Sequence, residues 1–288
     1  MSYPYVVSGD AHLLLKEWAQ SNGFEFDEYL FHGLRATLIG DLRRIFGKVE
    51  YVDGEELREG LHELVQNHGV APISLDYAYY RTRDSLKLSR HVDSRNRDID
   101  IAARYGSKPL SDQIGDLQFN EGDVALVDDV IYTGDLVLRL AETLKEAGLR
   151  VTHAFAGVGV GAGTNRIRQT GIHVACVREY LNVIDEVCER DFFPGVPYSG
   201  RSLVNSENVG IPYLLPWGLP GRWASIPKKY QIDFSATRIL DSRDLYREIE
   251  RISGKPVTMN QLGRKFPTCG INSNSVFEVL DRLYVRFV

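Results

Sequence analysis

The pattern of apolar and polar residues is most regular in the middle of the chain. Val124 to Val127 are four consecutive apolar residues, which predict a short buried strand. Apolar residues then recur at helical spacing as far as Gly148, a residue type that commonly ends helices: Leu136, Val137, Leu140, Leu144 and Ala147. Residues 150–160 predict a second strand. Such a strand, turn, helix and strand form a parallel crossover, whose turn lies at the carboxyl edge of the sheet, where α/β proteins bind ligands.

The residues ahead of this unit predict helices and one strand. Residues 10–47 indicate two helices, with Asp10 as the N-cap of the first and Gly47 at the end of the second. A third helix, with acids in its first turn, is indicated around Leu57 to Leu64. Residues 70–80, VAPISLDYAYY, are rich in β-formers. We therefore expect an N-terminal helical elaboration ahead of a core sheet.

The residues after the central unit predict one more core strand and then less regular structure. Residues 172–180 predict the strand, whereas segments 188–202 and 213–227 are rich in turn residues, and the Trp residues of the second are expected to pack onto the core. From residue 233 onward we expect three short helices, over residues 245–252 (capped by Ser242), 259–266 and 275–283. The expected domains are residues 1–232 and a small helical tail, 233–288, either a winged helix-turn-helix module or a packing segment.

The composition excludes several classes of protein. Hydrophobic residues make up 43% and charged residues 25% of the 288 positions, which suffices for a packed core without disulfides. Cys176, Cys188 and Cys269 are widely spaced, as in a reducing compartment, and no zinc-ligand spacing is present. A net charge of -5 argues against a general nucleic-acid coat. No signal-peptide pattern and no membrane-spanning apolar run is evident, so we expect a cytoplasmic protein.

The turn after the first central strand carries the most specific chemistry. Asp128 and Asp129 follow the strand directly, and a short loop, residues 130–134, precedes the helix. A helix N-terminus presents unpaired backbone N–H groups and partial positive charge, so residues 131–135, with the Thr133 hydroxyl, can cradle a phosphate group. The two carboxylates can accept hydrogen bonds from sugar hydroxyls or help to hold a hydrated divalent cation. This combination describes a ribose 5-phosphate site.

These residues resemble a known family. The segment VALVDDVIYTG, residues 124–134, is similar to the phosphoribosyl-diphosphate loop of the type I phosphoribosyltransferases, in which an apolar strand, two acids, a short apolar link and Thr-Gly follow one another. The resemblance implies an α/β fold with a parallel sheet flanked by helices. It implies that Asp128 and Asp129, as the catalytic acids, orient the ribose hydroxyls and help to hold Mg²⁺. It further implies that the 5-phosphate is held by the residues that follow: Val130, Ile131, Tyr132, Thr133, Gly134 and Asp135.

Three features depart from the family pattern. Leu136 stands where the family usually carries Ser or Thr, so one phosphate hydrogen bond is missing, and Asp135 adds a negative charge to the cradle. Tyr132 stands where the 6-oxopurine enzymes have an Asp credited with base catalysis, so hypoxanthine or guanine salvage is less expected. A Gly-containing diphosphate turn, usual after the first core strand, is not evident between residues 49 and 83.

Cationic and aromatic residues elsewhere are candidates for the remaining substrate contacts. The basic segment 81–97 is either a solvated loop or hairpin, or a cationic flap that faces a diphosphate. Residues 104–118 have the position and the Gly and Pro content of the family's mobile loop. Segment 188–202 is either a proline-rich surface loop or, by resemblance, the base pocket. The candidate substrate-binding residues are Arg81, Arg104, Lys108, Asp191 and Phe192.

The predicted function is transfer of ribose 5-phosphate between phosphoribosyl diphosphate and a nitrogenous base, a pentosyltransferase reaction of nucleotide salvage or biosynthesis with Mg²⁺. One alternative is a non-catalytic sensor of phosphoribosyl diphosphate or nucleotides, with residues 233–288 as its output module. Another is an N-glycosidic hydrolase, in which water replaces diphosphate. The resemblance carries the expectation of a homodimer. Nucleic-acid binding by the tail is not expected, because acids dilute the charge of Arg264 and Lys265, and no membrane partner is expected.

Overall fold

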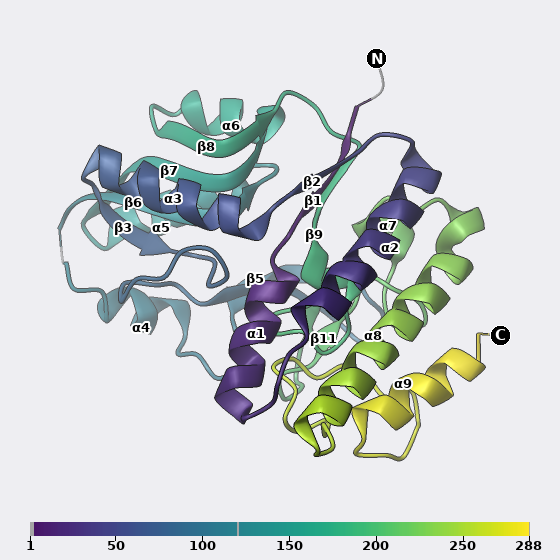
Figure 1. Cartoon of the computed structure of the whole chain (residues 1–288). Helices are drawn as coiled ribbons and strands as arrows, with labels where there is room; N and C mark the ends of the chain where they lie inside the picture. Colours follow the sequence, from purple (N-terminus) through teal and green to yellow (C-terminus); the bar gives the residue numbers. More distant parts are fainter. Residues whose placement is uncertain (1–2, 120, 288) are drawn as a thin grey trace. The chain divides into compact units, whose positions relative to one another are not determined.

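The computed structural model describes residues 3–119 and 121–287 (Figure 1). The chain forms two compact units, each assembled from separate segments. Unit 1 contains Met1–Tyr51, His91–Ile99 and Ile184–Val288, and unit 2 contains Val52–Arg90 and Asp100–Val183. The boundary expected at residue 233 is therefore not a boundary between compact units.

Unit 2 is built on a parallel sheet of order β3-β6-β7-β8. Its strands are β3 (Ala71–Ser74), β6 (Gly122–Ile131), β7 (Leu149–Val160) and β8 (His173–Tyr180). Its helices are α3 (Gly54–His68), α4 (Leu110–Gly115), α5 (Asp135–Glu146) and α6 (Gly161–Arg168). Helix α3 crosses one face of the sheet in Figure 1. Apolar residues of β6 such as Leu126 share one buried cluster with Leu140 and Leu144 of α5, so the helical spacing in the sequence marks the face that packs on the sheet.

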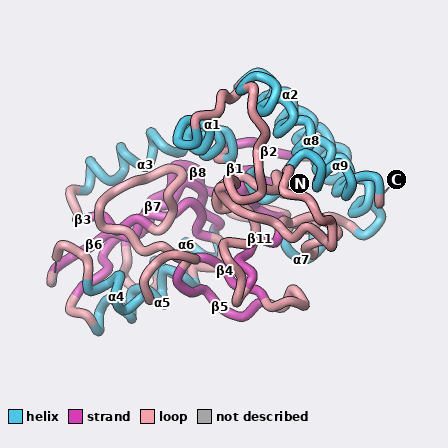
Figure 2. The backbone as a smooth tube through the Cα atoms, turned by 90° about the horizontal axis from the view of Figure 1, so that it is seen from below, coloured by secondary structure: helices cyan, strands magenta, loops and turns pink. Residues whose placement is uncertain are grey.

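Unit 1 contains the ends of the chain. Strands β1 (Tyr5–Ser8), β2 (Val49–Val52) and β9 (Asp185–Cys188) form a sheet of order β2-β1-β9, in which β1 and β9 are parallel. A second sheet has the order β11-β10-β4-β5. Its strands β10 (Arg201–Leu203) and β11 (Gly210–Ile211) belong to unit 1, whereas β4 (Leu88–Val92) and β5 (Asp98–Ala103) each have residues assigned to both units. The helices are α1 (Ala11–Asn22), α2 (Glu28–Phe46), α7 (Pro220–Trp223), α8 (Gln231–Ser253) and α9 (Val276–Val285), with short 3-10 turns at Glu189–Phe192 and Lys228–Tyr230. Helices α8 and α9 lie side by side in Figures 1 and 2.

The predicted α/β fold with a parallel sheet and flanking helices is confirmed. The predictions of the first three helices, the central helix and the strands at 150–160 and 172–180 are also confirmed. The loop expected from Val130 was placed too early, because Val130 and Ile131 remain paired with Val158 and Gly159 of β7. The turn is therefore limited to residues 132–134.

Asp10 stands at the N-cap position of α1, as expected, but its carboxylate does not cap the helix. Its side chain makes no capping hydrogen bond to α1. The Asp10 carboxylate instead accepts the backbone N–H of Arg190 at 2.9 Å and pairs with the Arg190 guanidinium at 2.7 Å. The Asp10 carboxylate, which the local sequence predicted to accept N–H groups of α1, thus binds Arg190, 180 positions later in the chain.

The expected helix over residues 245–252 is only the end of α8, which begins at Gln231. Ser242 lies inside α8 and donates to the Arg238 carbonyl at 2.9 Å, so its expected role as an N-cap is wrong. Buried Arg238 pairs with Asp41 of α2 and with Asp241, both at 2.9 Å, which ties α8 to α2. The boundary at residue 233 falls within this packed helix.

Of the remaining predictions for the C-terminal part, one is wrong and two are confirmed. Residues 259–266 are not helical, because the backbone N–H of Met259 donates across to the Asn274 carbonyl at 2.8 Å. The last helix, α9, begins where expected, with the Ser275 hydroxyl accepting the Glu278 N–H at 3.2 Å. The expected packing of Trp217 and Trp223 is confirmed, since both are buried.

Two segments ahead of the central unit also differ from expectation in extent. Only Ala71–Ser74 of the β-rich run 70–80 forms a strand. The second half of the basic segment 81–97 forms a hairpin with the residues that follow it, in which β4 pairs with β5, and the Asp93 N–H donates to the Arg97 carbonyl at 3.0 Å in the turn. Among the described residues, no helix has the length and apolar character needed to cross a membrane.

Candidate functional site

Asp128 and Asp129 lie near the carboxyl end of β6, between β3 and β7 in the sheet of unit 2. The Asp129 N–H donates to Oδ1 of Asp128 at 3.0 Å, and the Val130 N–H donates to Oδ1 of Asp129 at 2.8 Å. Successive residues of a strand point to opposite faces, so the two carboxylates leave the strand in different directions. This arrangement leaves each acid with lone pairs for further donors.

Asp128 is the buried member of the pair. Burial raises the pKa of its carboxyl group well above the usual value, and the neighbouring carboxylates of Asp129 and Asp76 raise this pKa further. A carboxyl group with a raised pKa retains its proton more readily, so Asp128 can donate as well as accept a hydrogen bond. A cation near Asp128 would oppose this shift.

Asp76 is a site residue that sequence reasoning missed. It follows β3, whose end is held to β6 by a hydrogen bond from the Leu75 N–H to the Val127 carbonyl at 2.8 Å. The Asp76 carboxylate accepts the Ala78 N–H at 2.7 Å and is close enough to raise the pKa of Asp128. In the sequence Asp76 is a single acid within an apolar run. It can be related to Asp128 and Asp129 only when β3 and β6 are known to be neighbouring strands.

The turn between β6 and α5 forms the candidate phosphate cradle, which we define as Tyr132 to Asp135. Gly134 has a φ of +79° and stands as the N-cap of α5, a left-handed conformation that favours glycine. The Thr133 hydroxyl donates to Oδ2 of Asp135 at 2.6 Å. The Asp135 N–H donates to Oγ1 of Thr133 at 3.4 Å, so the first turn of α5 lies beside one hydroxyl and one carboxylate.

The start of α6 packs tightly against this cradle. A Cβ atom on Gly163 would lie 2.4 Å from the Tyr132 carbonyl oxygen, and one on Gly134 would lie 3.0 Å from the Gly163 carbonyl oxygen. The glycine run at 157–163 is thus a place where two backbones approach closely. This approach brings Arg166 of α6 to Asp135, with which it forms an ion pair. Sequence reasoning missed Arg166.

Leu136, the departure from the expected Ser or Thr, has a structural role. Its side chain packs against the buried cluster formed by the sheet and α5. Leu136 therefore gives the cradle no hydroxyl and instead adds an apolar contact to the cluster beneath the cradle.

The carboxylates fit a weakly held Mg²⁺ better than a closed metal site. Among the described residues, no group of three or more His, Cys, Asp or Glu side chains is placed to hold a metal ion. Mg²⁺ usually binds through one or two carboxylates and takes its other oxygens from water and substrate phosphates. Asp128 and Asp129 provide a donor set of that kind.

The predicted cationic ligands in unit 2 have protein partners. Arg81 donates from Nε to the Tyr77 carbonyl at 2.9 Å, and Arg104 donates from Nη2 to the Leu88 carbonyl at 3.0 Å. Lys108 pairs with Asp116 at 2.7 Å, within a segment that forms α4 rather than an open loop. Their roles in binding diphosphate stay predictions.

The predicted base-binding pair lies in unit 1. Asp191 accepts the Gly200 N–H at 2.7 Å. The Phe192 side chain is fully buried and meets Phe234 edge-on, with ring centroids 5.3 Å apart. In this structure both residues support the local fold, and their role toward a base stays a prediction.

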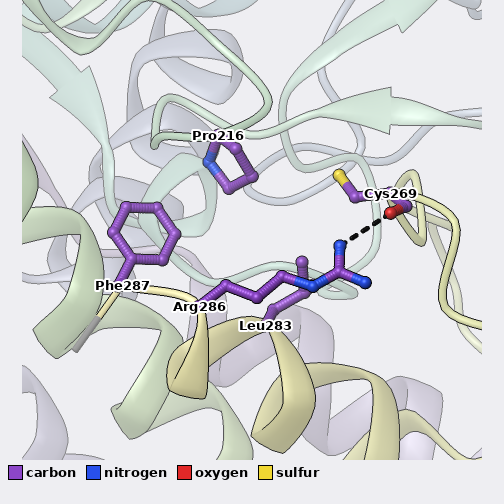
Figure 3. A pocket seen from close by; sticks show the side chains of 5 residues that line it. All are labelled: Pro216, Cys269, Leu283, Arg286 and Phe287. Atoms are coloured by element: carbon purple, nitrogen blue, oxygen red, sulfur yellow. Dashed lines mark hydrogen bonds between the residues drawn. The ribbon is translucent and has the colours of Figure 1, made fainter.

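Unit 1 also contains a cavity of about 210 Å³ (Figure 3). The residues that line it are Pro216, Cys269, Leu283, Arg286 and Phe287. Arg286 points across the cavity and donates to the Cys269 carbonyl at 2.8 Å. No predicted site residue lines this cavity.

Comparisons with known proteins locate the chain in a family, although no family model matches it. It is 38% identical over 85 residues to a hypoxanthine/guanine phosphoribosyltransferase of Methanosalsum zhilinae, a match that covers 28% of the chain and 45% of that protein. It is 36% identical over 85 residues to an adenine phosphoribosyltransferase of Novosphingobium aromaticivorans, covering 28% of the chain and 47% of that protein. The chain thus spans about half the length of these curated relatives.

A longer match has lower identity. The adenine phosphoribosyltransferase of Erythrobacter litoralis is 30% identical over 146 residues, which cover 49% of the chain and 76% of that protein. An orotate phosphoribosyltransferase structure from Aeropyrum pernix has 18% identity and a TM-score of 0.30, over 43% of the chain and 68% of that structure. Another, from Mycobacterium tuberculosis, has 16% identity and a TM-score of 0.29, over 43% of the chain and 68% of that structure.

The fold is that of an α/β protein whose parallel sheet carries two acids and a helix N-terminus at its carboxyl edge. With the match across three quarters of the Erythrobacter relative, the chain belongs to the type I phosphoribosyltransferase family.

Proposed function

We propose that the chain is a pentosyltransferase that moves ribose 5-phosphate between phosphoribosyl diphosphate and a nitrogenous base. The observation that carries the proposal is the position of Asp128 and Asp129 on β6 immediately ahead of the α5 N-terminus. An acceptor pair for a sugar diol stands here next to a donor set for a phosphate, in the order that ribose 5-phosphate requires.

In the proposed reaction, the protein binds and orients the sugar and leaves the nitrogen base to attack C1. The backbone N–H groups of the first turn of α5 and the Thr133 hydroxyl hold the 5-phosphate. Asp128 and Asp129 accept hydrogen bonds from the ribose hydroxyls, which fixes C1 relative to the incoming base. As the C1–N bond forms, the C1–O bond to diphosphate breaks, and the negative carboxylates stabilise positive charge that develops on the sugar. Diphosphate leaves with the electrons of the C1–O bond, and the proton of the attacking nitrogen passes to water.

Mg²⁺, when bound, supplies charge neutralisation of the diphosphate leaving group. Asp128 and Asp129 are the residues that would hold it, directly or through water. A cation at this position favours the ionised form of Asp128, so binding of Mg²⁺ and diphosphate would be coupled to release of the Asp128 proton.

The test is calorimetric titration of the purified chain with phosphoribosyl diphosphate, with and without Mg²⁺, and with ribose 5-phosphate as the comparison. We expect Mg²⁺-dependent binding that is tighter than binding of ribose 5-phosphate, followed by release of diphosphate when a suitable base is present. Adenine, hypoxanthine, guanine and orotate are the bases to screen, because the relatives and solved structures named above include enzymes for them.

The matched control uses a third acid of the same strand. Asp123 lies at the amino end of β6, where it pairs with Arg150 at 2.7 Å. Asp129→Asn is expected to abolish binding of the ribose moiety, whereas Asp123→Asn is expected to leave binding unchanged. Equal effects of the two substitutions would contradict the assigned site.

The same titrations separate the other functions. Tight binding of nucleotides or phosphoribosyl diphosphate without turnover of any base would indicate a sensor. Release of a free base from a nucleotide in water, without diphosphate, would indicate a hydrolase. Either result overturns the proposed transferase activity.

A further inference from the structure

The candidate phosphate cradle already holds an anion, and that anion belongs to the protein. Asp135 is the first residue of α5 and follows Gly134, the N-cap. Its Oδ2 accepts the Thr133 hydroxyl at 2.6 Å, and its Oδ1 accepts Nη1 of Arg166. The Asp135 carboxylate therefore occupies two of the donors that a phosphate oxygen at this helix N-terminus would use.

The backbone of α6, which carries Arg166, packs tightly against the cradle. The close approach of Gly163 to Tyr132 and Gly134 fixes the first turn of α6 against the cradle. Nη1 of Arg166 also donates to the Thr133 carbonyl at 3.2 Å. The guanidinium thus contacts both the carboxylate and the backbone of the cradle, and its bond to the Thr133 carbonyl does not depend on the carboxylate.

The charge balance of the cradle depends on this pair. The Thr133 hydrogen bond, and after it the Arg166 guanidinium, lower the pKa of Asp135, so its carboxylate is ionised at neutral pH. A second cation, Arg139 on the next turn of α5, also faces Asp135 but pairs with Asp100. The side chains of Arg166 and Asp135 are 52% and 57% exposed, so a phosphate can approach both from solvent.

We propose that Arg166 is a further ligand of the 5-phosphate and that Asp135 is a built-in competitor, which must leave Thr133 and Arg166 before the phosphate can bind. This inference rests on the proposed function, since it assigns a donor and a competing acceptor within the same phosphate site. Arg166 supplies from α6 a donor in a cradle where Leu136 lacks a hydroxyl. Asp135 satisfies these donors itself, which reduces the net gain when a phosphate binds.

The competition predicts opposite effects of two substitutions. Arg166→Gln removes a charge-assisted donor, and we expect Kd for ribose 5-phosphate and for inorganic phosphate to rise about tenfold. Asp135→Asn removes the competing negative charge, and we expect Kd for both ligands to fall about threefold or more. In the double variant, Asp135→Asn should give little gain, because the shared partner is absent. Arg166→Lys should restore part of the affinity.

The experiment is calorimetric titration of the full chain with ribose 5-phosphate and with inorganic phosphate at constant ionic strength, with Tm measured for each variant. The control pair is Asp123 and Arg150, an exposed ion pair on the same sheet. Asp123→Asn and Arg150→Gln should leave both Kd values within a factor of two. An unchanged Kd in Arg166→Gln, or no gain in Asp135→Asn, would overturn the proposal, as would the absence of any phosphate binding by the wild type.

The outcomes separate this inference from the proposed function. If phosphate affinity changes as expected but no base is turned over, the transferase proposal fails and the assignment of Arg166 and Asp135 stands. If turnover occurs but KM for phosphoribosyl diphosphate is the same in Arg166→Gln and Asp135→Asn as in the wild type, the function stands and this inference fails.

Discussion

The backbone N–H of Asp129 donates to the carboxylate of Asp128 at 3.0 Å, yet only Asp128 is buried among the sheet residues. Two adjacent acids of one strand therefore have different electrostatic surroundings. Burial, followed by the charges of Asp129 and Asp76, raises the pKa of Asp128. The acid proposed to contact the ligand is thus one that the folded protein holds in its ionised form at a cost in stability.

This relationship predicts that Asp128→Asn stabilises the folded chain in a pH-dependent manner. The folded pKa of Asp128 lies above its unfolded value, so the folded state binds more protons between these pKa values, and stability is lost as pH rises through the folded pKa. Asn at position 128 has the same shape but does not ionise, so the variant does not lose stability in this way. We expect Asp128→Asn to exceed the wild type by about 1–3 kcal/mol at pH 8 and by less near pH 4, measured by urea unfolding.

Asp123→Asn is the control for this pH dependence. A side-chain hydrogen bond from Arg150 lowers the pKa of Asp123, so its contribution has the opposite sign and is lost as pH falls. A gain in stability for Asp123→Asn at pH 8, equal to that of Asp128→Asn, would show that a general charge effect is responsible.

Gly163→Ala is expected to destabilise the cradle. The added Cβ would lie 2.4 Å from the Tyr132 carbonyl oxygen and 3.0 Å from the Gly134 nitrogen, so backbone must shift. We expect a loss of about 1–3 kcal/mol in the free energy of unfolding, together with weaker binding of ribose 5-phosphate. Thermal unfolding and calorimetric titration measure the two effects.

Gly40→Ala serves as the comparison, because Gly40 lies within α2 and its Cβ would meet nothing within 4 Å. Alanine there should stabilise the chain by about 0.4–1 kcal/mol. If Gly163→Ala behaved like Gly40→Ala, the close packing of α6 against the cradle would be wrong.

A chain ended at residue 232 is expected not to fold. The cut removes nearly all of α8, including buried Arg238, Leu245 and Tyr246, and leaves Asp41 of α2 without its partner from that helix. Each large buried apolar side chain contributes about 1.5–3 kcal/mol, so the loss exceeds the stability of an ordinary domain. Circular dichroism and size-exclusion chromatography of the truncated chain test this, and a cooperative melting transition equal to that of the full chain would contradict it.

Three histidines of unit 2 predict acid sensitivity. His153 on β7 lies opposite His173 on β8, with ring centroids 5.2 Å apart, and His68 is 5.5 Å from His153. Burial and then the charges of His173 and His68 lower the pKa of His153, against a smaller opposing effect of Asp123. The unfolded chain therefore binds more protons, and stability falls as pH drops from about 6.5 through the folded pKa.

His173→Gln should weaken this acid sensitivity, because it removes one of the positive charges that His153 meets on protonation. The measurement is Tm between pH 5 and pH 7.5, in which the variant should lose less than the wild type. His62→Gln, on α3 beside Tyr80 and outside the cluster, should follow the wild-type profile. Identical profiles for His173→Gln and the wild type would contradict the prediction.

Local patterns predicted much of unit 2 because its elements carry their own signals. The spacing of Leu140 and Leu144 marks the buried face of α5, and Gly148, with a φ of +87°, ends that helix as expected. Asp128, Asp129 and Thr133 lie close together in the sequence, so their combination could be recognised as one motif without a structure.

Residues brought in by tertiary contacts could not be predicted in this way. Arg166 is 31 positions from Asp135, and only the packing of Gly163 reveals the pair. The four residues of β1 are too few for a periodic signal, and their partner β9 comes 180 positions later. Ser242 has the residue type of a cap, but packing of α8 on α2 extends the helix past it.

The division of unit 1 into separate segments has a consequence for synthesis on the ribosome. Strand β1 has β2 as an early neighbour but must wait for β9, its parallel partner on the other side, which comes 180 positions later. Unit 2 is complete once Val183 has emerged, while Ile184–Val288 is still to be made. The nascent chain can therefore form the candidate phosphate cradle first, while the apolar residues of α1 and α2 wait for the segments of unit 1 that follow Val183.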